Sequence, residues 1–170
     1  IPVLAIPGEF DSPLSMYESS FCGIQPFVKN LHQAKFDSDE FSFFGYGGRI
    51  IESDDITPEE YFVVQYPYNM LKYKFRKFKY SLSDKIIVLG TPPTISDSAI
   101  SDVEHYCCRN ISELAVEIKP KIIICKGFDS NGGIDFVQNA WLIQAGHLCL
   151  NNFVTFDTTT QEFIRGKFKD

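Results

Sequence analysis

Carboxylates follow three apolar runs of the chain, at positions where a strand would end. They are Glu9 and Asp11 after residues 2–6, Asp129 after residues 121–125, and Asp157 after residues 153–156. In a parallel α/β sheet, ligands bind beyond the carboxyl ends of the strands. If those ends converge, the carboxylates meet Lys126 and several hydroxyls, a set suited to acid–base chemistry or to a hard cation. The same residue types also form ordinary turns and caps.

The motifs that would specify a reaction are absent. The chain has no G-x-G-x-x-G after a strand, no G-x-x-x-x-G-K-[ST] and no G-x-S-x-G. There is no C-x-x-C, and the vicinal Cys107 and Cys108 cannot easily serve one tetrahedral zinc. We therefore predict no cofactor and no metal site, and the sequence leaves open whether the protein is an enzyme.

A basic and aromatic stretch covers residues 71–85. It holds six of the 16 Lys and Arg residues and one of the 22 Asp and Glu residues, whereas the whole chain has a net charge of −6. Its candidate binding residues are Lys72, Lys74, Arg76, Lys77 and Lys79. Period-two alternation predicts a strand with a bulge, its aromatic side chains on the core and its lysines in water. The alternatives are a contact with an acidic protein partner, or single-stranded nucleic acid, which the net charge disfavours.

Composition and cysteine content limit the class of protein. Apolar residues make up 44% of the 170 and aromatic residues 15%, enough for one domain with a core. No apolar window is long enough to span a membrane, so we expect no membrane partner. Five cysteines are too few for a disulfide scaffold. Cys125 and Cys149 resemble buried strand positions, which favours an intracellular, cytoplasmic protein.

The second half of the chain predicts the architecture. Residues 85–90 and 121–125 are continuous apolar runs typical of strands buried on both faces, and a third strand region covers 148–156. Helical spacing predicts helices over residues 96–118 and 132–146. Strand and helix thus alternate, which indicates right-handed crossovers and a parallel sheet.

The first half adds further elements to that sheet. Residues 2–6 predict another buried strand, parallel to the first two, and short helices are expected before Cys22 and from Pro26. Residues 41–46 and 49–52 flank Gly47 and Gly48, which indicates a hairpin, and residues 61–66 are also β-like. We therefore expect an antiparallel, aromatic-rich hairpin region at about residues 40–80.

Two segments resemble parts of known families. Residues 111–127 resemble the matching segment of uracil-DNA glycosylases, and residues 118–150 are similar to the apical domain of group II chaperonins. Neither resemblance implies a site residue here.

Together these patterns predict a single three-layer α/β domain over residues 1–170, part of a longer protein, with a mostly parallel sheet flanked by helices. Because no catalytic motif is found, the favoured function is a non-catalytic protein interaction or assembly module. The alternatives are a hydrolase or transferase for a nucleotide-like or phosphorylated substrate, using the four loop carboxylates, and a single-stranded nucleic-acid binder using residues 71–85.

Overall fold

The computed structural model describes residues 2–11, 13–21, 24, 27–52, 63–81, 83–93, 108–126, 132–146 and 148–168. The strands are β1 (Val3–Ala5), β2 (Val28–Asn30), β3 (Lys35–Asp37), β4 (Phe41–Tyr46), β5 (Arg49–Ile51), β6 (Gln65–Pro67), β7 (Asp84–Leu89), β8 (Ile122–Cys125), β9 (Gly133–Val137), β10 (Ala140–Gln144), β11 (Asn152–Phe156) and β12 (Phe163–Lys167). The helices are α1 (Leu14–Ser19), α2 (Tyr68–Phe78), α3 (Arg109–Ile118) and the 3₁₀ turn η2 (Leu148–Leu150).

A mixed six-stranded sheet in the order β3-β4-β7-β8-β10-β9 forms the centre of the fold. Its four inner strands are mutually parallel, and the edge strands β3 and β9 are antiparallel to their neighbours. Ile87 of β7 lies opposite Ile123 of β8, so these two predicted strands are confirmed as parallel neighbours. The α/β class is therefore confirmed, with a mixed sheet in place of a mostly parallel one.

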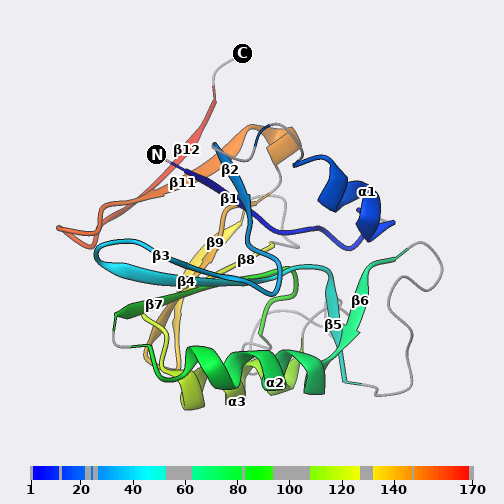
Figure 1. Ribbon diagram of the computed structural model, residues 1–170. Coiled ribbons are helices and arrows are strands. Elements are labelled where there is room, and N and C mark those ends of the chain that lie inside the picture. Colours follow the sequence, from blue (N-terminus) through cyan, green and yellow to red (C-terminus); the bar gives the residue numbers. More distant parts are fainter. Residues whose placement is uncertain are drawn as a thin grey trace.

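Helices α2 and α3 cover one face of this sheet (Figure 1). Strand side chains alternate between the two faces, so Ile87, Ile123 and Leu142 face the helices. From α2, Phe75 and Phe78 meet this layer, and both are almost fully buried.

The opposite face is covered by the antiparallel pair β11–β12, whose Val154, Phe156 and Phe163 pack against the sheet. The sheet contributes the alternate residues to this second cluster, including Ile86 and Ile122. Figure 1 places β1 and β2 on the same side as β11 and β12. In the described part of the chain, the second face thus carries strands where the sequence predicted helices.

Residues 71–78 are helical, so the predicted basic strand is wrong. Leu71, Phe75 and Phe78 are spaced at i, i+4 and i+7 and all are buried, which is the period of a helix. The period-two alternation included Tyr73 and Tyr80, which are 63% and 78% exposed and take no part in the core. In the described part of the region at 40–80, β4, β5 and β6 therefore make no antiparallel pair with one another, and residues 68–78 are a helix.

Residues 133–144 form the β9–β10 hairpin, so the predicted helix over 132–146 is also wrong. The turn residues Gln138 and Asn139 both have positive φ, 51° and 66°, as a two-residue hairpin turn requires. Neither residue is a glycine, and the usual sequence signal for this turn is therefore missing.

Two further strand pairings differ from prediction. The 41–46 and 49–51 strands do not pair with each other, because β4 belongs to the central sheet and β5 pairs in parallel with β6. Strand β1 pairs with β2 in a separate two-stranded sheet, and residues 28–30 are a strand where a helix was expected. Of the predicted helix over 96–118, α3 confirms 109–118, and residues 96–107 lie outside the described residues.

The cysteines differ from one another in burial. Cys125 is buried in β8 as predicted, whereas Cys149 is exposed in η2. Within the described ranges, no helix combines the length and the hydrophobicity that a membrane-spanning segment needs.

Candidate functional site

The carboxyl ends of β4, β7 and β8 meet at one edge of the central sheet, because the three strands are parallel. Backbone hydrogen bonds join the loops that follow them. The Gly90 amide donates to the Tyr46 carbonyl at 2.9 Å, and the Gly48 amide donates to the Pro7 carbonyl at 2.8 Å. The loop after β1 is therefore held against this edge, although β1 belongs to another sheet.

Glycines allow these backbones to approach closely. A Cβ atom added to Gly90 would lie 2.2 Å from the carbonyl oxygen of Gly48, and one added to Gly47 would lie 2.4 Å from that of Pro7. Gly48 also has a φ of +75°, in the region that favours glycine. The sequence indicated a hairpin turn at Gly47 and Gly48. In the structure, these two glycines and Gly90 instead let three loops pack closely together at this edge of the sheet.

An ion pair links two distant parts of the chain at this edge. The Lys126 ammonium, directly after β8, donates to Oε1 of Glu9 at 3.0 Å. The Glu9 side chain is 11% exposed and that of Lys126 is 39% exposed. The ammonium also lies 5.5 Å from the ring centroid of Phe10, within cation–π range. Of the predicted site residues, the structure thus brings Glu9 together with Lys126.

Asp11 stabilises the loop that carries Glu9. Its Oδ2 accepts a hydrogen bond of 2.7 Å from the Gly8 amide. This side-chain-to-backbone bond is typical of a tight turn. Asp11 therefore lies beside the candidate site with its carboxylate engaged in loop geometry.

Asp157 is separated from the other candidates. Its Oδ1 accepts hydrogen bonds from the amides of Thr159 and Thr160 in the turn between β11 and β12. These bonds lower the pKa of the exposed carboxyl. Figure 1 shows this turn on the left of the molecule and the loop from β1 to α1 on the right. The expected convergence of Asp157 with Glu9 is therefore wrong, and Asp129 lies outside the described residues.

His32 is a buried residue at the same edge to which the sequence assigned no role. Its Nδ1 accepts a hydrogen bond from the Gly47 amide at 3.0 Å, and its Nε2 lies 3.0 Å from the Tyr66 hydroxyl. Burial, assisted by the charge of Lys74, lowers the pKa of His32 to about 4. The neutral imidazole thus supports the glycine loop.

Acid is expected to destabilise the fold through His32. The unfolded chain binds a proton at this residue near pH 6.5 and the folded chain near pH 4, so the unfolded state binds more protons between these values. The contribution of neutral His32 to the free energy of unfolding is therefore fully present above the unfolded pKa. It decreases by about 3 kcal/mol as the pH falls toward 4. Urea unfolding of wild type and His32→Gln from pH 7 to pH 4 measures it. Identical pH dependence in both proteins would contradict this assignment.

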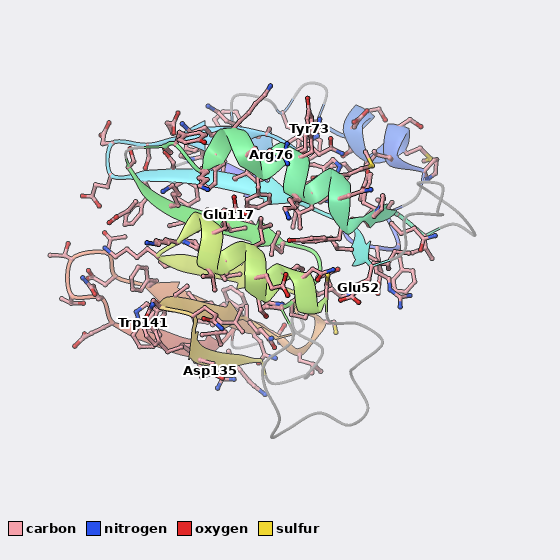
Figure 2. All side chains as sticks on the ribbon, turned by 90° about the horizontal axis from the view of Figure 1, so that it is seen from below. Glu52, Tyr73, Arg76, Glu117, Asp135 and Trp141 are labelled. Atoms are coloured by element: carbon pink, nitrogen blue, oxygen red, sulfur yellow. The ribbon has the colours of Figure 1, made fainter. Side chains whose placement is uncertain are left out.

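Four of the six basic residues of the 71–85 stretch, Lys72, Lys74, Arg76 and Lys77, lie on α2, while Lys79 directly follows that helix and Lys85 lies in β7. Lys79 donates to Glu117 of α3 at 3.0 Å. Lys79, Lys72 and Arg76 all lower the pKa of the Glu117 carboxyl, and Figure 2 shows Arg76 and Glu117 on the two neighbouring helices. Part of this basic surface therefore neutralises an acidic residue of the same layer.

A comparison with protein families decides the affiliation of the chain. The model of the family described as metallophosphoesterase, calcineurin superfamily, matches residues 1–168. The chain belongs to this metallophosphoesterase family.

Solved structures support the metallophosphoesterase fold. One crystal structure superposes with a TM-score of 0.81 at 21% identity, covering 99% of this chain and 66% of that chain. The crystal structure of TT1561 of Thermus thermophilus also has a TM-score of 0.81, at 18% identity, covering 98% of this chain and 72% of that one. The chain thus spans just under two thirds of the first of these proteins. No curated protein sequence matches it significantly.

The family corrects the favoured functional prediction. A non-catalytic interaction or assembly module is wrong, because a metallophosphoesterase family points to a phosphoester hydrolase. The alternative of a hydrolase for a phosphorylated substrate agrees better with the family. The family also replaces the two segment resemblances, to glycosylases and chaperonins.

The described residues of this metallophosphoesterase do not fit the metal ion that the family name implies. In the ranges that the structure describes, no three His, Cys, Asp or Glu residues group closely enough to hold one. At the candidate edge, Glu9 is paired with Lys126, Asp11 with the Gly8 amide, and His32 with Gly47 and Tyr66. The side chains of Glu9 and Lys126 are therefore the chemical groups that the described residues place at this edge.

Proposed function

We propose that this metallophosphoesterase-family chain hydrolyses phosphate esters at the carboxyl-end edge of β7 and β8, around Glu9 and Lys126. The observation that carries the proposal is the Lys126–Glu9 ion pair of 3.0 Å at the edge where α/β sheets bind ligands. Nucleotide-like and other phosphorylated small molecules are the substrate class that this chemistry would serve.

Phosphate ester hydrolysis requires positive charge for the phosphoryl oxygens, because negative charge on them must be stabilised in the transition state. Lys126 is well placed to supply it, since its side chain is 39% exposed and its ammonium carries three donors. Glu9, more deeply buried, would orient that ammonium toward the edge. Glu9 is thus proposed as a positioning residue.

A water molecule that attacks phosphorus must also lose a proton. Asp129 follows Lys126 by three positions in the sequence and is the candidate general base, as the polar strand-end pattern predicted. Asp11 would act indirectly, through the Gly8 amide that fixes the loop of Glu9.

Hydrolysis of a substrate panel tests the proposal. The purified chain is assayed with p-nitrophenyl phosphate, bis-p-nitrophenyl phosphate and nucleoside monophosphates. We expect turnover of at least one class, and Glu9→Gln is expected to lower kcat/KM about 10-fold or more through misorientation of Lys126. The matched control is Asp84→Asn, which removes the carboxylate of a second 3.0 Å ion pair, with Lys121 at the amino ends of β7 and β8.

Two results would count against the proposal. The first is no turnover of any ester by the folded wild-type chain. The second is an equal loss in Glu9→Gln and Asp84→Asn, because that would make the effect a general consequence of removing an ion pair.

A further inference from the structure

We infer that the ammonium of Lys126 occupies the cation position beside Glu9 and excludes divalent metal ions from that carboxylate. The inference concerns cation binding, and it holds or fails independently of the hydrolysis proposed above. It follows from the disagreement between the metal that the family name implies and the residues described at this edge.

The burial of Glu9 limits its carboxylate to one cationic partner. Only 11% of the side chain is exposed, and the Lys126 ammonium already lies 3.0 Å from Oε1. A divalent ion bound to the same carboxylate would lie within a few ångströms of that ammonium, and the two like charges would repel each other strongly in a partly dry site. Either cation can satisfy Glu9, but not both together.

Among the described residues, neither Asp11 nor His32 is available as a second ligand to compensate for this repulsion. Asp11 Oδ2 holds the Gly8 amide at 2.7 Å, and His32 Nδ1 holds the Gly47 amide at 3.0 Å. A metal ion at Glu9 would have to displace the ammonium, and it would recruit Asp11 or His32 as a further ligand only at the cost of these backbone contacts. In contrast, the ammonium keeps all of them and also contacts the Phe10 ring.

The position of the Glu9–Lys126 pair indicates a role other than stabilising the fold. An ion pair on a partly exposed surface stabilises a fold little. Here it places a fixed positive charge at the carboxyl-end edge of β8, joining residues 117 positions apart in the chain. A permanent side-chain cation at this edge does not depend on the metal supply.

Removal of the ammonium should convert Glu9 into a metal ligand. The probe is Mn²⁺ alone, with the free ion measured by electron paramagnetic resonance during titration of the full chain. Lys126→Met is expected to gain one Mn²⁺ site and to bind Mn²⁺ about 10-fold more tightly than wild type, whose own weak binding should be unchanged in Glu9→Gln. The gain should disappear in the double variant Glu9→Gln, Lys126→Met, and Lys126→Arg should retain exclusion because it keeps the charge.

Lys121→Met is the matched control. It removes the ammonium of the other 3.0 Å pair of the same sheet, whose carboxylate, Asp84, is 57% exposed and remains solvated by water. No Mn²⁺ site is expected there. Circular dichroism of each variant establishes that it is folded.

Two results would overturn the inference. One is Mn²⁺ binding by wild type that Glu9→Gln abolishes, a comparison that does not depend on the folding of any Lys126 variant. The other is a folded Lys126→Met protein that binds Mn²⁺ no better than Lys121→Met. Ester hydrolysis together with the first result would leave the proposed function standing, whereas Mn²⁺ exclusion without hydrolysis would remove only that function.

Discussion

Gly90→Ala is expected to destabilise the protein by about 3 kcal/mol, lowering the melting temperature by about 10 °C. The added Cβ would lie 2.2 Å from the carbonyl oxygen of Gly48 and 2.8 Å from its nitrogen. Both are backbone atoms held by neighbouring hydrogen bonds, so relief requires the loops after β4 and β7 to separate. Because the Gly90 amide also bonds the Tyr46 carbonyl, the whole sheet edge is disturbed.

Gly133→Ala provides the control for this substitution. Gly133 lies in the edge strand β9, and a Cβ there would have no atom within 4 Å. Alanine at this position is expected to change the melting temperature little, because glycine is itself unfavourable in a strand. Differential scanning calorimetry of the two variants measures the contrast. A Gly90→Ala protein as stable as Gly133→Ala would show that the glycine contact at the edge is unimportant.

Lys126→Met is expected to lower kcat/KM for phosphate esters about 100-fold, the magnitude found for the loss of one donor to a developing oxyanion. Methionine keeps much of the length and apolar contact of lysine while removing the charge. The carboxylate of Glu9 is then left without its ammonium, and its negative charge faces the incoming phosphate. The loss thus combines a missing attraction with a new repulsion.

Steady-state kinetics show whether Lys126 acts on the bound substrate or on the transition state. A rise in KM alone would mean that Lys126 binds the ground state and the transition state equally, and a fall in kcat means that it acts more strongly in the transition state. Lys126→Arg should recover part of the activity because it restores the charge. Lys121→Met should retain full activity, and a comparable loss in that variant would contradict a special role for Lys126.

The parallel core could be predicted because its signal is local. The runs at 85–90 and 121–125 are continuous and rich in β-branched residues, and each forms a strand buried on both faces, so the core strands follow directly from the pattern. Helix α2 could not be predicted in this way, since its sequence satisfies two periods. The contact of Phe44 with Phe75, at a ring-centroid distance of 4.4 Å, and with Phe78 selects the helical period, and it is a tertiary contact.

Only part of the candidate site could be predicted, again because some of its contacts are tertiary. Glu9 and Lys126 lie together as expected, but not for the expected reason, because β1 pairs with β2 outside the central sheet. The hydrogen bond from the Gly48 amide to the Pro7 carbonyl holds the loop of Glu9 against the sheet instead. Asp157 was included on the premise that its strand lies in the same sheet. That strand, β11, instead pairs with β12 on the opposite face, so its carboxyl end leads elsewhere. His32 was missed because no local pattern reveals that its imidazole accepts the Gly47 amide.

A titration of the ¹⁵N-labelled chain with inorganic phosphate, followed by ¹H–¹⁵N correlation spectra, tests the location of the site most directly. Binding at the proposed edge predicts shifts of the Glu9, Gly47, Gly90 and Lys126 amides, with little change at Lys121 or along α2, and loss of these shifts in Lys126→Met. Shifts confined to α2, which carries Lys72, Lys74, Arg76 and Lys77, would contradict a phosphate site at Glu9 and Lys126 and would place anion binding on the helical face instead.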